Sequence, residues 1–289
     1  QSHPGITARV IPEKRIGRTA LDAIAGAFPL VGRTVTLTDA QLDRYARHIV
    51  LREIGGAGQM RLLNADVVVI GAGGIGSPAI LYLAAAGVGT IRVIDDDVVA
   101  LSNLQRQVLF GTDDIGSPKA EAAMAAVARI NPDVKLIPIN ARIDADNAGL
   151  MFRDADVVLD GCDNFATRLI VADAAQRLRI PLVSAAVGPF EGQMATYRGW
   201  EADKPCYRCL VGDPQDAPER NCAETGVIGA LTGTIGSLAA LETIRALVPF
   251  GTDMAGQLLI ADLLTMRFRT VDVAKDPACS GCAMELCAP

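Results

Sequence analysis

Four of the seven cysteines stand in two C-x-x-C pairs, Cys206 with Cys209 and Cys279 with Cys282. This spacing suits two ligands of one tetrahedral zinc ion, although the interval between the pairs is far longer than in a compact zinc finger. A shell of four thiolates leaves no position open for water. We therefore predict a structural zinc that ties the C-terminal segment to the body of the protein; free thiols or a redox pair are the alternative.

A glycine-rich turn is the second chemical signal. Gly71, Gly73 and Gly76 fit the pattern G-x-G-x-x-G between an apolar run and an alanine-rich stretch. Backbone N–H groups and a helix dipole at such a turn can approach a phosphate closely. Asp95, at the end of the next apolar run, is placed to bond a ribose hydroxyl. These features alone also fit an NAD-dependent dehydrogenase.

The segment after that aspartate favours a triphosphate over a dinucleotide. The stretch "DDDVVALSNLQRQ", followed by "GSPK", groups polar and charged side chains at Asp95, Asp97, Asn103, Arg106, Gln107 and Lys119. A triphosphate carries several negative charges, and charge-assisted bonds from Arg106 and Lys119 can offset their repulsion. Neither histidine, His3 or His48, stands at a strand end where a dehydrogenase would need its proton donor. We therefore predict an ATP site.

Two further residues, Asp163 and Cys222, carry possible chemistry. Asp163 follows an apolar strand at its carboxyl edge, where a Mg²⁺ bound to ATP oxygens could lie; a helix N-cap is its other possible role. Cys222 lies in a polar loop beside Arg220, a setting that activates a thiol, and its catalytic role is left open. We expect Cys162 and Cys287 to be inert.

The elements that must position these residues alternate between strands and helices. We expect strands at Val67–Ile70, Ile91–Asp95, Lys135–Ile139, Val157–Asp160 and Leu182–Ala186, and helices at Gly76–Ala86, Pro118–Ile130 and Asn164–Leu178. Continuous apolar strands joined by helices predict an α/β fold with a doubly wound, Rossmann-like, mostly parallel sheet. From residue 192 onward, "GQMATY", "LLIAD" and "RFRTVDV" predict an antiparallel extension, with a helix at about Gly229 to Val248.

The N-terminal part consists of a segment with weak hydrophobic periodicity followed by a clear helix signal. Residues 1–37 have weak periodicity and are interpreted as an extension, with residues 38–289 forming a single domain. Thr38 and Gln41 have the spacing of a capping box, which predicts one helix over "TDAQLDRYARHIVL" that ends before Gly55.

Charge and sequence pattern argue against several classes of function, although local basic sites remain possible. The net charge of -6 and a pI near 5.0 argue against nucleic-acid and anionic-membrane binding, because both need a positive field. The longest uncharged run, 225–241, is shorter than the roughly 18 to 20 apolar residues of a membrane span. The first residues lack the pattern of a secretory signal. Cysteines that serve as metal ligands indicate a reducing compartment, and we expect a cytoplasmic protein.

In these motifs the chain resembles the MoeB/ThiF group of the ubiquitin-activating-like adenylyltransferase superfamily. The resemblance spans about residues 42–282 and rests on the order of "RYARHIVLREIGGAGQ", "GAGGIGS", "DDDVVALSNLQRQ", "GSPK", "LDGCDN", "CYRC", "ERNCAETGV" and "CSGC". It implies that Gly74 approaches the nucleotide through its backbone and that Asp95 holds the ribose. It assigns the phosphates to Asn103, Arg106 and Lys119, and a magnesium ion to Asp163. It also implies that Arg47 reaches into the active site of a partner subunit, so that the active unit is a homodimer; a surface arginine paired with Asp43 or Glu53 is the alternative.

The resemblance predicts an ATP-dependent adenylyltransferase. Its substrate would be a small ubiquitin-like sulfur-carrier protein, whose C-terminal Gly-Gly carboxylate becomes an acyl adenylate with release of pyrophosphate. A separate donor would supply the sulfur, because "ELCAP" at the C-terminus is too short for a sulfurtransferase domain. The ending "LLTMRFRTVDV" favours a MoaD-like carrier of molybdopterin biosynthesis over a ThiS-like carrier of thiamin biosynthesis. Adenylation of a ribosomal peptide, a non-catalytic partner subunit and the dehydrogenase are the alternatives.

Overall fold

The computed structural model describes residues 37–212 and 226–283 of the 289-residue chain. All described residues belong to one compact unit of the chain, which holds every element named below. Cys222 and Cys287 also lie outside the described residues. Among the helices of the described ranges, none has the length and apolar character needed to cross a membrane.

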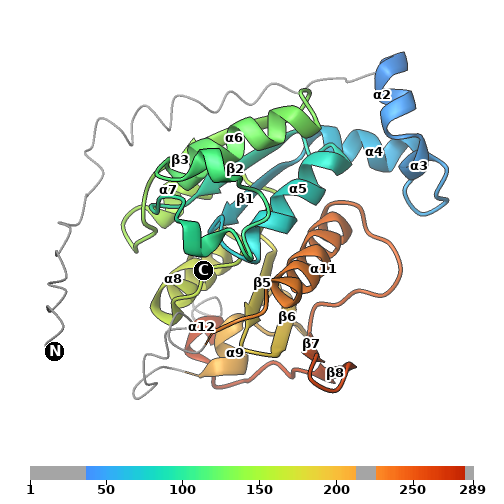
Figure 1. Ribbon diagram of the computed structural model, residues 1–289. Helices are drawn as coiled ribbons and strands as arrows, with labels where there is room; N and C mark the ends of the chain where they lie inside the picture. The colour runs from blue at the N-terminus through green and yellow to red at the C-terminus, as the bar shows by residue number, and fades with distance from the viewer. Residues whose placement is uncertain (1–36, 213–225, 284–289) are drawn as a thin grey trace, which may run out of the picture. The chain divides into compact units, whose positions relative to one another are not determined.

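One eight-stranded sheet runs through the described part of the chain, in the order β3-β2-β1-β4-β5-β6-β7-β8 (Figure 1). Strands β1 to β5 pair in parallel, and β6, β7 and β8 add antiparallel to the β5 edge. The strands are β1 Asp66–Ile70, β2 Thr90–Ile94, β3 Lys135–Ile139, β4 Val157–Asp160, β5 Leu182–Val187, β6 Glu191–Tyr197, β7 Gln257–Asp262 and β8 Arg267–Asp272. The predicted parallel sheet with a late antiparallel extension is confirmed.

Helices connect and flank the strands. They are α2 Asp39–Arg44, α3 Ala46–Ile49, α4 Gly55–Asn64, α5 Gly76–Ala86, α6 Lys119–Ile130, α7 Ala148–Met151, α8 Phe165–Leu178, α9 Tyr207–Val211, α11 Gly229–Leu247 and α12 Ser280–Ala283, with short 3-10 turns η1 Leu101–Asn103 and η2 Thr112–Asp114. The expected helices after β1, β2 and β4 and the late helix α11 are all present, with ends within one residue of the prediction.

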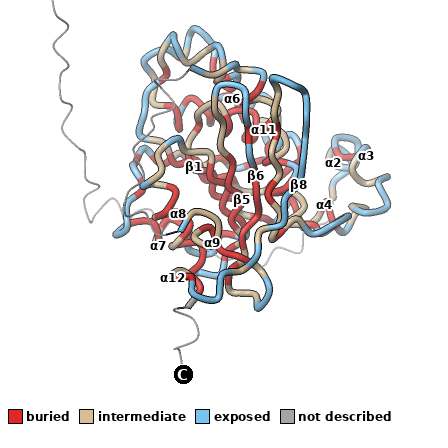
Figure 2. The backbone as a smooth tube through the Cα atoms, turned by 90° about the horizontal axis from the view of Figure 1, so that it is seen from below, coloured by how far each residue is buried: buried red, intermediate tan, exposed pale blue. Residues whose placement is uncertain are grey.

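The helices cover both faces of the parallel strands. Side chains of α5, α6 and α11 share a core cluster with Val67 and Val69 of β1. Alternate residues of a strand point to opposite faces, so Arg92 of β2 marks the other face, where its guanidinium reaches the carbonyl of Met151 in α7. Figure 2 shows the buried backbone along β1, β5 and β6 and the exposed backbone of the edge strand β8. This two-sided covering is the doubly wound arrangement.

The N-terminal helix differs from the prediction. The capping box of Thr38 and Gln41 is present, but the helix breaks at Tyr45 into α2 and α3. The reason is tertiary: the Tyr45 ring is buried against Gly87, and its Oη accepts a hydrogen bond of 2.8 Å from Asn131 Nδ2. The unpredicted helix α4 then begins at Gly55, whose φ of +60° turns the chain.

Two glycines let α11 lie close to the segments that follow β1 and β2. A Cβ on Gly236 would lie 2.3 Å from the carbonyl oxygen of Ile75, and one on Gly229 would lie 2.1 Å from that of Gln105. Real Cβ atoms do not approach a backbone oxygen so closely, so both positions need glycine. The start of α11 is thereby fixed between two of the predicted nucleotide-binding segments.

Candidate functional site

The strand order reverses between β1 and β4, and the residues that follow these two strands form the centre of the site. In open α/β sheets the ligand crevice lies at this switch point, beyond the carboxyl ends of the strands. The glycine loop follows β1, and the segment Gly161–Asn164 follows β4. The two segments lie side by side, because a Cβ on Gly71 would lie 3.5 Å from the carbonyl oxygen of Gly161.

The glycine loop has the geometry that a phosphate-binding turn needs. Gly71 has φ +83°, in the left-handed region. A Cβ on Gly76 would lie 1.8 Å from the carbonyl oxygen of Gly71, so the chain can turn into α5 only with glycine there. A Cβ on Gly73 would meet nothing within 4 Å, and one on Gly74 would meet Thr232 of α11 at 3.0 Å. The loop therefore presents open backbone at Gly73 and the N-terminus of α5, both suited to a phosphate.

Asp95 lies directly after β2 and is bonded to this loop. One carboxylate oxygen accepts a 2.7 Å hydrogen bond from the N–H of Ala72, and the other accepts one of 2.9 Å from the N–H of Asp97. Burial raises the pKa of Asp95, and the Lys119 ammonium partly opposes that shift. Each carboxylate oxygen keeps accepting capacity for a ribose hydroxyl.

Lys119 stands at the start of α6 and is held by Asp97. Its Nζ lies 2.8 Å from Asp97 Oδ2, and its backbone N–H donates to the carbonyl of Asp97 at 2.9 Å. The lysine side chain is only 6% exposed whereas the aspartate side chain is 69% exposed. A buried ammonium thus meets its counter-ion at the solvent boundary, where a phosphate could replace that carboxylate.

The segment Asn103–Gln107 completes this side of the site. Asn103 accepts from the N–H of Ala100 through its Oδ1 at 3.2 Å, and Arg106 donates to the carbonyl of Ser102 at 3.0 Å. Gln107 is 2% exposed, and its buried Oε1 has no hydrogen-bond partner among the described residues. A Cβ on Gly229 would lie 3.2 Å from the Cα of Arg106, so the first turn of α11 contacts this segment as well as the glycine loop.

Asp163 lies in the loop between β4 and α8. It is exposed and takes part in no hydrogen bond or ion pair within the described ranges. The N-cap of α8 is Asn164, whose Oδ1 accepts from the N–H of Thr167 at 2.9 Å, so Asp163 does not fill that alternative role. An exposed carboxylate beside the glycine loop fits the hard-oxygen preference of Mg²⁺.

The sequence interpretation missed Arg168. This α8 residue is 8% exposed and makes an ion pair with Asp160, the last residue of β4. A signal was available, since a charged residue one turn after an N-cap and followed by Leu169, Ile170 and Val171 needs a partner if its side of the helix is buried. Its partner could not be identified without the strand pairing.

Arg47 lies apart from these residues. It is exposed on α3, and within the part of the chain that the structure describes no carboxylate pairs with it, neither Asp43 nor Glu53. Tyr45 packs on Gly87, the residue that ends α5, whereas the glycine loop lies at the start of that helix. Eleven helical residues span about 16 Å. Arg47 therefore stands at the far end of α5 from the glycine loop of its own chain.

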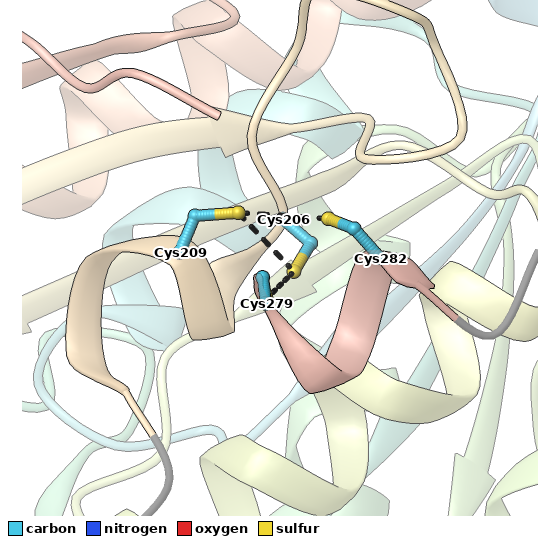
Figure 3. A group of neighbouring side chains, drawn as sticks. All are labelled: Cys206, Cys209, Cys279 and Cys282. Atoms are coloured by element: carbon cyan, nitrogen blue, oxygen red, sulfur yellow. Dashed lines mark hydrogen bonds between the residues drawn. The ribbon is translucent and has the colours of Figure 1, made fainter. Parts of the chain in front are cut away.

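The four paired cysteines come together at a second location (Figure 3). Cys206 and Cys209 lie at α9, Cys279 and Cys282 at α12, and all four Sγ atoms are within 4.8 Å of one another. Three of the six Sγ–Sγ separations are 3.8 Å (Cys206 to Cys209), 3.6 Å (Cys206 to Cys279) and 3.5 Å (Cys209 to Cys282). Four sulfurs around zinc at about 2.3 Å would be separated by about 3.8 Å, so the donor set and its spacing fit this metal.

The two residues between Cys206 and Cys209, Tyr207 and Arg208, connect this cluster to the rest of the unit. Arg208 makes a forked ion pair with Asp173 of α8, both distances being 2.8 Å. The Tyr207 ring packs edge-on against Tyr197 of β6 with centroids 5.5 Å apart, and burial raises the pKa of Tyr207 to about 12. The cysteine cluster is therefore bound to α8, the helix that follows Asp163.

Of the three cysteines outside the cluster, only Cys162 lies in the described part of the chain. Burial raises the pKa of Cys162 well above the ordinary thiol value, and the Asp160 carboxylate adds to that effect. A thiol in this environment is a poor nucleophile, in agreement with the expectation that Cys162 is inert. The role of Cys222 stays a hypothesis, because the residue lies outside the described ranges.

Comparison with known proteins places this geometry in context. Residues 45–281 match the ThiF family. The "SAMP-activating enzyme E1" of Haloferax volcanii is 48% identical over 250 residues, which cover 86% of this chain and 92% of the relative. The "Sulfur carrier protein ThiS adenylyltransferase" of Escherichia coli is 42% identical over 247 residues, which cover 85% of this chain and 97% of the relative.

A solved structure shares the fold. The crystal structure of E. coli MccB with MccA-N7isoASN has a TM-score of 0.73 and 23% sequence identity, over 83% of this chain and 74% of that chain. At this identity the likeness bears on the fold alone. It agrees with the sheet order and the helix layers described above.

Proposed function

The chain belongs to the ThiF family, and from that premise we propose that it is an ATP-dependent adenylyltransferase that activates the C-terminal carboxylate of a small ubiquitin-like sulfur-carrier protein. One observation carries the proposal: relatives that match the chain over nearly their whole length are named as activating or adenylylating enzymes of this kind. The open glycine loop beside Asp95 and Lys119 supports it. No observation in the described residues favours a dehydrogenase.

The reaction needs little acid–base chemistry. A carboxylate oxygen of the carrier attacks the α-phosphorus of ATP, a new P–O bond forms, the bond to the β-phosphate breaks, and pyrophosphate leaves with its electron pair. The attacking group is already ionised, so no proton has to be removed. The protein contributes by orienting the two reactants and offsetting charge on the phosphates.

Each residue has a distinct role in that scheme. The backbone at Gly73, at Gly74 and at the start of α5 would hold phosphate oxygens, with Gly71 and Gly76 shaping the turn, and Asp95 would hold the ribose. Arg106 and Lys119 would offset the charge of the phosphates, Lys119 by exchanging Asp97 for a phosphate oxygen. Asn103 and Gln107 would supply neutral hydrogen bonds, and the buried, unpartnered Oε1 of Gln107 supports such a contact.

Asp163 would hold the magnesium ion. Its exposed carboxylate makes no hydrogen bond within the described ranges, which leaves its oxygens available. When bound, the ion supplies further neutralisation of the phosphate charge. Asp160, at the end of β4, is unsuited to this role, because it is 1% exposed and already paired with Arg168.

The antiparallel strands are the proposed docking side for the carrier. Exposed apolar side chains gather on the β7–β8 hairpin and at the turn before β6: Leu264, Met266, Phe268, Val271 and Phe190. These strands extend the sheet from β5, so a carrier seated there could direct its tail toward the carboxyl ends of β1 and β4. We propose a MoaD-like carrier first and a ThiS-like carrier second, with the sulfur supplied by a separate donor.

We further propose a homodimer in which Arg47 acts on the partner's site. Arg47 is exposed at the far end of α5 from its own glycine loop. Beside it lies a groove of about 320 Å³ between α5 and α11, lined by His48, Tyr82, Ala85, Ala86, Ser237, Ala240, Leu241 and Ile244. Tyr82 is 57% exposed and Leu241 45% exposed. Apolar side chains exposed in this way would be buried against a second copy of the chain.

Zinc in the cysteine cluster would be structural. Four thiolates fill a tetrahedral shell and leave no place for substrate, so the metal supplies stability and not chemistry. Such thiols need a reducing compartment, which supports a cytoplasmic location.

Pyrophosphate exchange tests the proposal. Purified chain, Mg²⁺ and ATP should exchange labelled pyrophosphate into ATP only when a carrier ending in Gly-Gly is added, with a MoaD-like carrier giving more exchange than a ThiS-like carrier. The control is the same carrier with its last glycine deleted. Exchange independent of every carrier, or none with any of them, would refute the proposed substrate class.

A further inference from the structure

Arg168 lies under the loop that carries Asp163. The proposed reaction gives this residue no role. Its side chain runs from α8 back to the ends of β4 and β5. One guanidinium nitrogen donates to Asp160 Oδ2 at 3.2 Å and to Ser184 Oγ at 3.1 Å. The other donates to the carbonyl of Ala185 at 2.8 Å and to the carbonyl of Cys162. The guanidinium therefore ties two strands and the loop to one point.

These bonds fix the loop on both sides of Asp163. The N–H of Cys162 donates to Asp160 Oδ1 at 3.1 Å, while its carbonyl accepts from Arg168. On the other side, Asn164 is held as the N-cap of α8. The backbone before and after Asp163 is thus fixed, and within the described residues no hydrogen bond of the loop uses the Asp163 carboxylate.

The ion pair under the loop is also internally connected. Asp160 and Ser184 are register partners in the β4–β5 pairing, and Ser184 Oγ donates to Asp160 Oδ2 at 3.1 Å. Asp160 is 1% exposed and Arg168 is 8% exposed. Buried ion pairs are often no more stabilising than apolar side chains of similar volume, so stability alone is a weak reason for this one. What the pair does supply is a fixed loop geometry.

We propose that Arg168 is a positioning residue, which fixes the loop Asp160–Asn164 so that the Asp163 carboxylate stays in one place to bind the divalent cation of the nucleotide. The inference rests on the proposed function, because it assigns Asp163 to that cation. In this proposal Arg168 acts through the loop and is assigned no contact of its own with substrate or metal. Groups that orient a metal ligand from behind typically change metal affinity by about 10- to 100-fold when altered.

The chain offers a matched control in Arg92. This arginine is also buried, pairs with an aspartate at 2.7 Å, and donates to two backbone carbonyls, those of Met151 and Arg153. Its partner Asp66 is the first residue of β1, at the opposite edge of the sheet from the glycine loop. Arg92→Lys therefore removes the same kind of contacts without touching the Asp163 loop.

The test measures how tightly the full chain, together with a non-hydrolysable ATP analogue, binds Mn²⁺. Free Mn²⁺ is detected by its electron paramagnetic resonance signal, and the half-saturating Mn²⁺ concentration is the quantity compared. Arg168→Lys is expected to raise the half-saturating Mn²⁺ concentration by about 10-fold or more. Arg92→Lys is expected to lower the melting temperature but to keep the wild-type half-saturation. In pyrophosphate exchange, excess Mg²⁺ should restore much of the Arg168→Lys rate, which it would not do for a merely unstable protein.

Wild-type half-saturation in Arg168→Lys, or an equal shift in Arg92→Lys, overturns the positioning role. Should Arg168→Lys fail to fold, Ser184→Ala is the second variant, because it removes only the hydroxyl that bridges Arg168 and Asp160. Ser184→Ala should raise the half-saturating Mn²⁺ concentration by a smaller factor. An unchanged half-saturating concentration would overturn the inference. A wild-type chain that binds no metal–nucleotide would contradict the proposed function first, which separates the two failures.

Discussion

Arg106 and Lys119 are both proposed to offset the charge of the phosphates, but they differ in the contacts that they make before ATP binds. The charge of Lys119 is already balanced by Asp97, whereas Arg106 donates to the carbonyl of Ser102 and pairs with no carboxylate in the described ranges. Of these two residues, Arg106 is therefore the one whose charge is less compensated before ATP binds. Removing it should affect phosphate binding more than folding.

We predict that Arg106→Ala lowers carrier-dependent pyrophosphate exchange by roughly 10²-fold or more, the range expected for one preorganised charge stabiliser. Arg129→Ala, which removes an exposed arginine from the last turn of α6, is the matched control and should keep wild-type exchange. Near-wild-type exchange by Arg106→Ala would refute the role of this residue.

At the residue scale, the sequence predicted that Asp95, Asp97 and Lys119 belong to one site but not how they are held. Asp95 was singled out because it ends a predicted buried strand, at the edge of the sheet where a ligand crevice lies. Asp97 and Lys119 were added from the grouping of polar and charged residues that follows it. The 2.8 Å pairing of Lys119 with Asp97 was not predicted, since it depends on how α6 enters the fold. Arg168 was missed for the same reason, because its partners come from two other elements.

At the scale of elements, α11 connects the glycine loop to the phosphate-binding segment. Gly229 contacts Gln105, and Thr232 lies beside Gly74. A Cβ on Gly229 would lie 2.1 Å from a backbone oxygen, so the start of the helix would have to move away from the segment that holds Arg106.

We predict that Gly229→Ala raises the KM for ATP and lowers exchange by about 10-fold or more, the scale expected when a positioning contact is displaced by about an ångström. Gly233→Ala lies one turn further in the same helix, where an added Cβ meets nothing within 4 Å. This control should keep full activity and gain up to about 1 kcal/mol in stability from helix propensity. Equal kinetics in the two variants would contradict the coupling of α11 to the site.

The α9 and α12 pair depends on its metal. We predict one zinc per chain by elemental analysis, and loss of that zinc together with a lower melting temperature in Cys209→Ser; zinc could stabilise the fold by up to around 10 kcal/mol. Cys162→Ser is the control, since Cys162 is not in the cluster and its replacement should leave the zinc content unchanged. A folded, zinc-free wild-type chain would contradict the assignment.

The pH dependence of zinc binding follows from the thiols. Burial raises the pKa of Cys206, and it raises that of Cys282 to about 11. Metal binding requires the thiolates and must therefore release protons. Zinc affinity should consequently fall as the pH is lowered.

Elements were predicted well where periodicity is strong and poorly where tertiary contacts decide. Helix α5 and strand β3 have the predicted ends. The single N-terminal helix was wrong: burial of Tyr45 against Gly87 breaks it, a contact between residues far apart in sequence. Helix α4 was missed because its first residues are glycines, which are poor helix formers.

At the scale of the whole molecule, the proposed active unit is a dimer. We predict that Arg47→Ala loses about 10³-fold in exchange, comparable to removal of an arginine finger. Mixing inactive Arg47→Ala with inactive Asp163→Ala should restore partial activity, because one site of each mixed dimer combines an intact Asp163 with an intact Arg47 from its partner.

Each variant alone provides the baseline for the mixing experiment, and subunit exchange is verified with differently tagged chains. No recovery despite verified exchange would mean that Arg47 acts within its own chain.

The central claim is that a carrier carboxylate attacks the α-phosphorus of ATP in this site. Intact-mass measurement of the carrier after incubation with the protein, Mg²⁺ and ATP tests it most directly. The account predicts a carrier that has gained one adenylyl group, with pyrophosphate released in step. Consumption of ATP to ADP and phosphate with an unmodified carrier would contradict it.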